Sequence, residues 1–321
     1  MKVGYPQALL YYKYFPLWER FLGGLGAEVV LSGATTKNTV SMGTIAAESE
    51  LCLPVKVFYG HLLELKDKVD TIFVPRFVSV EKKSYTCPKF LGLPDMIRSI
   101  NDELPPLITP KIDLDKGWRE YFRTIHELGS NFSSSKRKIF SAYRAGVLAL
   151  RDYHNQLQAG STPIEFLEKK KYRKVKKTGL KIGLAGHPYN IYDTYTSMNL
   201  IKRLREMGAE VETAEMLDDN IIKREAARLP KKLFWTYEKE VVGTVFHWAH
   251  THSVDGIIYV LSFACGPDSL IQVILEHELR SDTALPMMSL VVDEHSGEAG
   301  LITRVEAFVD MLQRKKMAQL C

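Results

Sequence analysis

Residues 69–75 read VDTIFVP, and residues 254–260 read VDGIIYV. In each stretch a continuous apolar run follows an aspartate. Such runs are typical of strands buried on both faces of a sheet. Strands of this kind occur in parallel sheets that are covered by helices. The two stretches therefore favour an α/β fold whose strand pattern occurs twice.

The sequence around these stretches repeats in the same order. KVGY at 2–5 and KIGLA at 181–185 resemble short buried strands, and a helical stretch follows each of them. AEVVLS and AEVETAE come next, beginning at Ala27 and Ala209. Strand, helix and strand in succession predict a parallel sheet with right-handed crossovers. We therefore predict an α/β fold of two similar Rossmann-like domains with parallel sheets.

The middle of the chain has a different pattern. Apolar residues at three- and four-residue spacing predict amphipathic helices over 118–128 and 139–150, and this region lacks strand-like runs. We expect α/β domains over 1–99 and 180–321, joined by a helical connecting segment over 100–179.

Composition and charge are ordinary for a soluble globular protein. The 321 residues are 45% hydrophobic and 25% charged, with a net charge of +5. Eight basic residues and no acidic residue lie in the segment 169–181, so the remainder carries 5 − 8 = −3. A single basic segment predicts no nucleic-acid binding. It is either a solvated linker helix or a site for the phosphates of a ligand such as coenzyme A.

Two absences set further expectations. No apolar run approaches the roughly 18 residues of a membrane span, and the first residues do not resemble a signal peptide. We therefore expect a cytoplasmic protein with no membrane partner, and leave a dimer open. No P-loop motif occurs, and GGLG at 23–26 follows a helical stretch, as a helix C-cap does. If ATP is involved, we expect a partner to bind it.

Three of the four cysteines share an unusual context. Cys52 lies in ESELCLPVK, Cys87 in SYTCPKFLGLPD and Cys265 in LSFACGPDS, each with a proline within two residues. Cys87 and Cys265 follow the two matched apolar stretches. Because ligands bind at the carboxyl ends of parallel strands, we expect the three thiols to converge in a cleft between the domains.

Converging thiolates suit an iron-sulfur cluster or zinc. The alternative is that the three cysteines are simply small buried residues. The chain has no C-x-x-C motif, which disfavours a zinc ribbon or a bacterial ferredoxin. We do not count the terminal Cys321 as a ligand.

Other polar segments each allow two interpretations. GHPYNIYD could bind an anion at a helix start, or its aspartate could cap a helix; its polar residues are His187, Tyr189 and Asp193. FHWAHTH could bind a metal, or it could end a helix; its histidines are His247, His250 and His252.

Two more sets of charged residues also stay open. DEHSGEAGLITR could supply acid-base groups or cap the last helix; its charged residues and histidine are Asp293, Glu294, His295, Glu298 and Arg304. Lysines near the first two cysteines could stabilise thiolates or dock an acidic partner, or be solvated surface; they are Lys56, Lys82, Lys83 and Lys89.

Several longer segments carry a family resemblance: GYPQALLYYKYFPLWERF, ESELCLPVKVFYGHLLELKDKVD, the Cys87 segment, GLAGHPYNIYD, SFACGPDS and DEHSGEAGLITRVEAF. They resemble the uncharacterised acyl-CoA dehydratase activase-related family (DUF2229-like). Its members occur beside, or fused to, activators of 2-hydroxyacyl-CoA dehydratases, and they are similar to the dehydratase subunits. The resemblance is specific over 1–98 and 180–308.

The resemblance implies a 4Fe-4S cluster held by three cysteines, which carry over to Cys52, Cys87 and Cys265. The fourth iron would be left open to water or substrate. An ATP-dependent activator with its own cluster would supply low-potential electrons, as in anaerobic metabolism. The reaction would be that of a lyase or reductase on a small acyl-CoA-like substrate. Double-cubane reductases need more cysteines than this chain has.

Two alternatives to this function remain. The first is a non-catalytic electron relay or accessory protein of the activator. The second is a metal-free or zinc-bearing protein that binds a small molecule.

Overall fold

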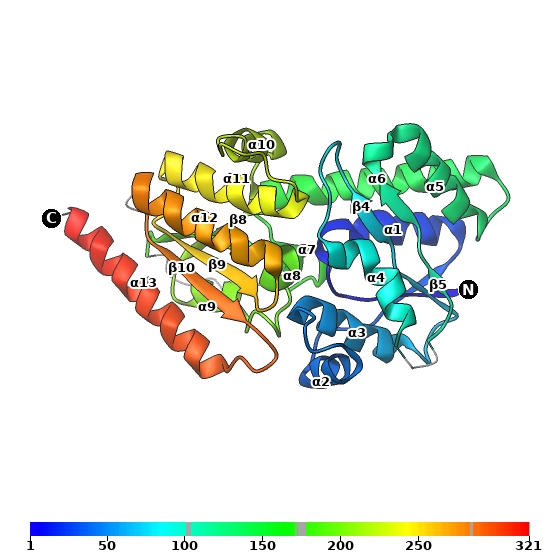
Figure 1. The fold of residues 1–321 in the computed structure, drawn as a ribbon, viewed down its shortest axis with the longest axis horizontal. Helices are drawn as coiled ribbons and strands as arrows, with labels where there is room; N and C mark the ends of the chain where they lie inside the picture. The colour runs from blue at the N-terminus through cyan, green and yellow to red at the C-terminus, as the bar shows by residue number, and fades with distance from the viewer. Residues whose placement is uncertain (101–103, 171, 173–177, 283–284, 321) are drawn as a thin grey trace. The chain divides into compact units, whose positions relative to one another are not determined.

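The computed structural model describes residues 1–100, 104–170, 172, 178–282 and 285–320 (Figure 1). The chain forms two compact units. Unit 1 comprises 1–156 and 233–236, and unit 2 comprises 157–232 and 237–321. Each unit has a parallel sheet with helices, so the predicted fold class is confirmed. The expected division at residues 99 and 179 stays a prediction.

Unit 1 contains a four-stranded parallel sheet in the order β2-β1-β3-β5. The sequence predicted three of these strands, β1, β2 and β3. Its strands are β1 (Lys2–Tyr5), β2 (Glu28–Leu31), β3 (Thr71–Phe73) and β5 (Leu107–Ile108).

Three short strands in unit 1 were not expected. β5 and β6 (Lys111–Asp113) lie in the segment that we predicted to be free of strands, and β6 pairs with β4 (Arg76–Ser79). The prediction was wrong there because strands of two or three residues are too short to show a periodic pattern. The 3-10 turn η1 (Leu114–Lys116) follows β6.

The helices of unit 1 include both helices predicted for the middle of the chain. They are α1 (Tyr11–Leu25), α2 (Lys37–Ala46), α3 (Leu53–Leu65), α4 (Pro88–Arg98), α5 (Trp118–Ser130) and α6 (Lys136–Gln158). α6 packs on α1 at close range, because a Cβ at Gly146 would lie 2.5 Å from the Leu17 carbonyl oxygen. The Tyr153 hydroxyl also donates a hydrogen bond to the Tyr12 carbonyl oxygen at 2.6 Å.

Unit 2 contains a second four-stranded parallel sheet in the order β10-β9-β7-β8. Its strands are β7 (Lys181–Gly186), β8 (Glu210–Thr213), β9 (Gly256–Ser262) and β10 (Met287–Val292). All seven residues of β9 are buried, as expected for an apolar strand covered on both faces.

The helices of unit 2 connect these strands. They are α7 (Pro163–Leu167), α8 (Pro188–Ile191), α9 (Leu200–Glu206), η2 (Ala214–Met216), α10 (Asp219–Ala226), α11 (Thr236–Thr251), α12 (Gly266–Asp282) and α13 (Glu298–Leu320). Within the described ranges, no helix combines the length and the apolar character that a membrane span requires.

The strand registers confirm the repeat. Lys2 of β1 pairs with Glu28 of β2, and Lys181 of β7 pairs with Glu210 of β8. In both units the first strand lies between the second and the third. The chain therefore reverses its direction of strand addition between β1 and β3, and again between β7 and β9. Such switch points are where open parallel sheets bind ligands, at the carboxyl ends of the strands.

The aspartate before the third strand has the same contacts in both units. Asp70 accepts a hydrogen bond from the Lys2 amide at 2.7 Å, and Asp255 accepts one from the Lys181 amide at 2.7 Å. The amide of each aspartate donates in return to the carbonyl oxygen of the same lysine. Asp70 and Asp255, the second residues of the two quoted stretches, therefore link the third strand of each unit to the first strand by hydrogen bonds.

Candidate functional site

Two of the three predicted ligand cysteines begin helices in unit 1. Cys52 is the N-cap of α3, and its carbonyl oxygen accepts a hydrogen bond from the Val55 amide at 3.0 Å. Cys87 is the N-cap of α4, and its carbonyl oxygen accepts one from the Phe90 amide at 3.0 Å. Both cysteines are half-buried, and a proline occupies one of the first two helical positions after each.

Cys265 holds a matching place in unit 2. It directly precedes α12, and its carbonyl oxygen accepts a hydrogen bond from the Ser269 amide at 3.0 Å. α12 follows β9, the third strand of its unit, and α4 follows β3 with only β4 between them. Cys87 and Cys265 therefore occupy equivalent positions in the repeat. Ala264 has a φ of 63°, in the left-handed region that alanine rarely adopts.

Each of these positions favours a negatively charged sulfur. The first turn of a helix presents backbone N–H groups and the positive end of the helix dipole, which stabilise a thiolate. Thiolates are the form in which cysteine binds iron or zinc. The donor chemistry of each cysteine thus fits a metal group. Cys265 belongs to a different unit from the other two, so the meeting of all three sulfur atoms stays a prediction.

Lysines near the starts of α3 and α4 both lower the pKa of Glu50. A hydrogen bond with the Ser49 side chain lowers the pKa of Glu50, and the charges of Lys56 and Lys89 lower it further. Lys56 lies in α3 and Lys89 in α4. The two helix starts that carry Cys52 and Cys87 are therefore within electrostatic reach of the same group.

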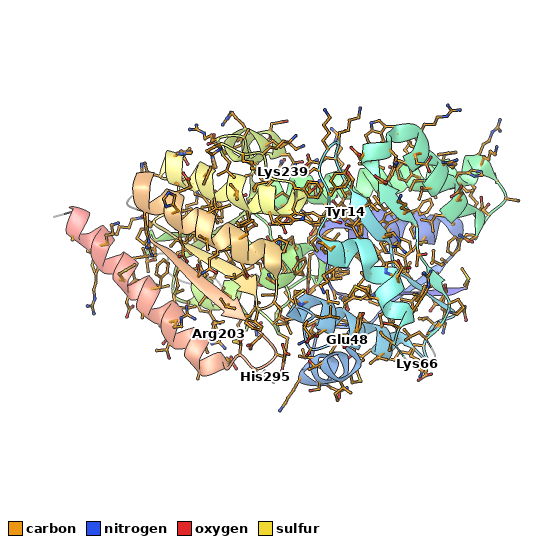
Figure 2. The ribbon with its side chains drawn as sticks, in the orientation of Figure 1. Tyr14, Glu48, Lys66, Arg203, Lys239 and His295 are labelled. Carbon is orange, nitrogen blue, oxygen red and sulfur yellow. The ribbon has the colours of Figure 1, made fainter. Side chains whose placement is uncertain are left out.

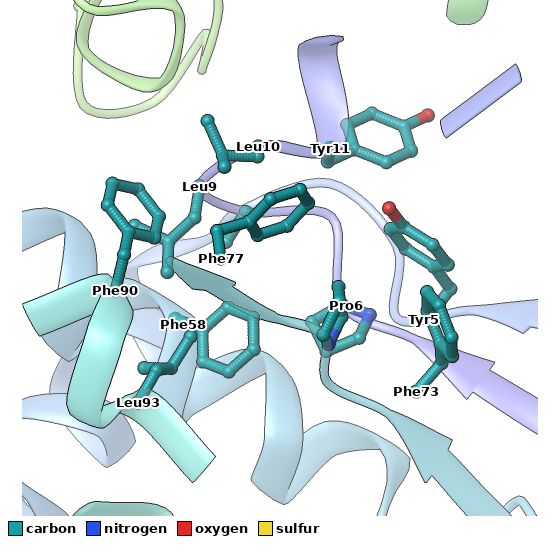
Figure 3. Close-up of a pocket in the computed structure, with 12 residues that line it drawn as sticks. Tyr5, Pro6, Leu9, Leu10, Tyr11, Phe58, Phe73, Phe77, Phe90 and Leu93 are labelled. Atoms are coloured by element: carbon teal, nitrogen blue, oxygen red, sulfur yellow. The ribbon is translucent and has the colours of Figure 1, made fainter. Parts of the chain in front are cut away.

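A small apolar cavity in unit 1 is lined by residues from the same two helices. Figure 3 shows Phe58 of α3 with Phe90 and Leu93 of α4, together with Leu9 and Phe77. Its volume is about 30 Å³, enough for about two water molecules. It is thus part of the core that supports the two helices, and it is too small for a substrate.

In unit 2, a buried histidine contacts two buried carboxyl groups. His187 follows β7 as the N-cap of α8. Its Nε2 lies 3.0 Å from Asp268 Oδ1 and 3.7 Å from Glu238 Oε1. The Tyr259 hydroxyl donates a hydrogen bond to the same Asp268 oxygen at 2.8 Å. His187, Asp268 and Glu238 are 2%, 1% and 3% exposed, so water screens these contacts little.

This environment alters two pKa values. Burial alone would lower the pKa of His187, but the charge and hydrogen bond of Asp268 and the charge of Glu238 raise it to about 9. Burial raises the pKa of Glu238, and the charge of His187 offsets part of that rise. The His187 ring is therefore protonated at neutral pH.

Cys265 lies beside this pair. One donor atom each of His187, Cys265 and Asp268 lies within 4.8 Å of the other two. Among the described residues, no other group of three His, Cys, Asp or Glu side chains is as close. The strands β7 and β9 bring His187 and Cys265 together, because both residues follow the carboxyl end of a strand at the switch point.

Asp268 and Glu238 were not among the residues that the sequence indicated. Asp268 follows Cys265 by three residues in the first turn of a helix, so both lie on one face. A C-x-x-D pattern directly after a buried strand is the signal that could have identified it. Glu238 carries no comparable local signal.

In the GHPYNIYD segment Asp193 closes a turn instead of capping a helix, because the N-caps of α8 and α9 are His187 and Asn199. The Asp193 carboxylate accepts hydrogen bonds from the amides of Tyr195 at 3.0 Å and Thr196 at 2.9 Å. These bonds close the turns before α9, which begins at Leu200. α8 has only four residues, and we assign no anion site to it.

The FHWAHTH histidines end a helix, as the second interpretation held. His247 and His250 lie in the last turns of α11. His250 Nδ1 is 3.0 Å from Glu225 Oε2, and His252 lies beyond the helix with a φ of 49°. Among the described residues, these histidines are not part of any group of three close metal donors.

The DEHSGEAGLITR segment forms a turn and then the first residues of α13, which begins at Glu298. Asp293 Oδ1 accepts hydrogen bonds from the His295 amide at 2.9 Å and the Ser296 hydroxyl at 2.8 Å. Glu298 in the first turn of α13 pairs with Arg203; Figure 2 labels Arg203 and His295.

The lysines near the first two cysteines differ from one another. Lys56 is 4% exposed, and its ammonium donates a hydrogen bond to the Ser49 carbonyl oxygen at 3.0 Å. The interpretation as solvated surface is therefore wrong for Lys56. Lys82 and Lys83 are exposed, and Lys89 is half-buried.

Parts of two further predictions lie outside the described residues. These are 171 and 173–177 of the basic segment, and Cys321. At the described ends of the segment, Lys170 pairs with Glu168 and Lys181 pairs with Glu212.

A larger depression in unit 1 lies along β6 and α5 and has a volume of about 840 Å³. Its size falls within the range of ligand pockets. Lys111 lies 3.2 Å from Asp113, and Arg123 pairs with Glu120. Because these charges are paired with each other, they do not point to a site for phosphate groups.

Together, these features define an α/β protein of two similar units with cysteines at helix starts. Residues 2–217, more than half of the chain, match the family described as CoA enzyme activase uncharacterised domain (DUF2229). The chain therefore belongs to this CoA enzyme activase-related family. A comparison with curated proteins gives no match.

Proposed function

We propose that this protein binds a 4Fe-4S cluster through Cys52, Cys87 and Cys265 and works with an ATP-dependent activator that carries its own cluster. In this proposal the protein is a relative of the 2-hydroxyacyl-CoA dehydratase subunits. Its reaction would be the reduction or dehydration of a small acyl-CoA-like substrate.

The observation that carries the proposal is the common placement of the three cysteines. Each one starts a helix, with a proline at the first or second helical position. Nothing in helix formation calls for cysteine at an N-cap, where serine, threonine, aspartate and asparagine are preferred. Three cysteines at such positions therefore favour a chemical role, and membership of an activase-related family supports a partner that is an activator.

The surrounding residues suit an anionic group. Lys56 and Lys89 place positive charge near the unit 1 cysteines, and the protonated His187 does so beside Cys265. Backbone N–H groups at the helix starts can donate hydrogen bonds to sulfur, which tunes the potential of a bound cluster. When bound, the cluster would supply one-electron transfer and an iron open to substrate.

Anaerobic purification tests the proposal. We expect a brown protein with about four irons and four sulfides per chain. The single substitutions Cys52→Ser, Cys87→Ser and Cys265→Ser should each abolish the brown colour and lower the iron content. Cys321→Ser is the matched control and should leave both unchanged. A colourless, iron-free protein from anaerobic cells, resistant to reconstitution with iron and sulfide, would overturn the proposal.

A second experiment separates an enzyme from an electron relay. The reconstituted protein is mixed with an activator, ATP, a strong reductant and a panel of 2-hydroxyacyl-CoA thioesters. Net loss of a thioester supports catalysis by this chain. Reduction of the cluster by the activator without loss of any thioester supports the relay.

A further inference from the structure

We propose that unit 2 forms a mononuclear site for a divalent metal ion of the zinc class, with Cys265, His187 and Asp268 as its three protein ligands. The site lies at the carboxyl edge of the unit 2 sheet. It shares Cys265 with the proposed cluster site but uses neither Cys52 nor Cys87, so it goes beyond the proposed cluster.

The spacing of the three donors suits a single ion. A tetrahedral ion with bonds of about 2.0–2.3 Å holds its ligand atoms roughly 3.5 Å apart. The donor atoms of Cys265, His187 and Asp268 already lie within 4.8 Å of one another. Small side-chain rotations would therefore bring them to bonding distance, and the ion would displace the proton from the ligating nitrogen of His187 into solvent. One sulfur, one nitrogen and one oxygen donor favour Zn²⁺, Co²⁺ or Fe²⁺ over Mg²⁺ or Ca²⁺.

A second, independent observation concerns Asp268. Its side chain is 1% exposed, and its Oδ2 has no hydrogen-bond partner among the described residues. A buried carboxylate oxygen without a partner is costly in free energy. Its other oxygen is held in place by Tyr259 and faces His187. A metal ion would supply the partner that the buried oxygen lacks.

A further carboxylate lies next to the three donors. Glu238 Oε1 is 3.7 Å from His187 Nε2, the nitrogen that also faces Asp268, so its negative charge adds to the attraction for a cation. Cys265 is half-buried, whereas His187 and Asp268 are buried, so an ion would approach from the side of Cys265. Three protein ligands leave a fourth position for water or for a small ligand.

The mononuclear ion and the cluster exclude each other, because Cys265 can serve only one of them. The mononuclear site is therefore the metal site of the chain that carries no cluster. Its test uses the cluster-free protein, so the outcome does not depend on whether the cluster proposal holds.

Cobalt binding tests the inference on the full-length chain. Iron-free protein is prepared with a chelator and titrated with Co²⁺ while its absorption spectrum is recorded. We expect one Co²⁺ per chain, with the visible bands of a tetrahedral site and a thiolate-to-cobalt charge-transfer band, and displacement of the cobalt by Zn²⁺. The Cys52→Ser/Cys87→Ser double variant, which should not hold a cluster, should show the same spectrum and affinity.

Substitutions of the ligands should weaken this binding. Cys265→Ser should remove the charge-transfer band, and Asp268→Asn should lower the affinity for Co²⁺ by about 100-fold or more. Asp219→Asn is the matched control, because Asp219 is an exposed aspartate in the first turn of α10. It should bind as the original protein does. Cys265 is half-buried, so its serine variant keeps the test decisive if Asp268→Asn does not fold.

Three outcomes would overturn the inference. One is folded, iron-free protein that binds no Co²⁺. Another is full loss of binding in the Cys52→Ser/Cys87→Ser variant, which would place the ion at those cysteines. The last is unchanged binding by Cys265→Ser. None of these measurements involves iron or sulfide, so failure here is separate from failure of the cluster proposal.

Discussion

His187 Nε2 lies 3.0 Å from Asp268 Oδ1, and both side chains are almost completely buried. Burial opposes a charge on the ring, yet the neighbouring carboxyl groups raise the pKa of His187 to about 9. An ordinary histidine has a pKa near 6.5 and is mostly neutral at pH 7. The buried His187 ring therefore carries a proton at pH 7.

The first prediction concerns this proton. In the metal-free protein the His187 ring should titrate near pH 9, and Asp268→Asn should lower the pKa of His187, because the charge and hydrogen bond of Asp268 are lost while burial still opposes the charged ring. NMR titration of the ring carbons measures both values, with the exposed His295 as reference. A pKa of His187 that Asp268→Asn leaves unchanged would refute the assignment.

The same shift makes a second prediction, about stability. The folded pKa of His187 lies above its unfolded value, so its contribution is complete below about pH 6.5 and is lost as the pH rises through about 9. His187→Gln should therefore lose less stability than the original protein between about pH 6 and about pH 10. Urea unfolding at the two pH values checks this. Equal losses in the two proteins would contradict it.

A third prediction tests whether Cys52 and Cys87 are present for chemistry or for the fold. Neither side chain makes a capping hydrogen bond, although both residues are N-caps. Serine is a preferred N-cap, so Cys52→Ser and Cys87→Ser should leave the cluster-free protein as stable as before, or up to about 1 kcal/mol more stable. Thermal unfolding measures the change.

Thr36 supplies the contrasting control. Its side chain accepts a hydrogen bond from the Thr39 amide in the capping box of α2. Thr36→Ala should cost about 1 kcal/mol. If the serine variants lose as much as Thr36→Ala does, the two cysteines are structural.

The sequence predicted those parts of the fold whose cause is local. Apolar runs such as 254–260 predicted buried strands, and the stripe over 118–128 predicted α5, because burial repeats with the period of the element. β5 and β6 escaped prediction because two or three residues form a strand only through their neighbours. The pairing of Ile72 with Leu107 is such a tertiary effect.

The candidate site follows the same division. The cysteines could be found because proline beside cysteine is visible in the sequence. Glu238 and Asp268 could not be found with the same ease, since their importance comes from burial against His187, which lies far away in the chain. The burial of Lys56 could not be predicted for a similar reason: α3 is buried over most of its length, and the lysine is buried with it.

A fourth prediction follows from the close packing of Gly183 in β7, which corresponds to Gly4 in β1. A Cβ on Gly183 would lie 2.6 Å from Trp248 Cε3, and the indole is fully buried and donates a hydrogen bond to Glu212 at 2.7 Å. Gly183→Ala should therefore destabilise the protein by about 1–3 kcal/mol. Gly300→Ala in α13, where a Cβ meets nothing within 4 Å, should be neutral or stabilising by up to about 1 kcal/mol. Urea unfolding of both variants decides, and equal effects would show that the indole can move aside.

A fifth prediction concerns acid stability at the start of unit 2. Burial alone would raise the pKa of Glu165, but hydrogen bonds from Arg205 at 2.8 Å and from the Thr162 hydroxyl at 2.8 Å lower it below its ordinary value of 4.5. A lowered folded pKa gives stability that is present above pH 4.5 and is lost as the pH falls through the folded pKa. Glu165→Gln should thus cost about 1 kcal/mol at neutral pH and show a weaker loss of stability in acid.

Glu206→Gln, which alters only an exposed pair with Lys202, is the control and should keep the original pH profile. An acid profile of Glu165→Gln that matches the original would mean that the Arg205 pair contributes nothing to stability.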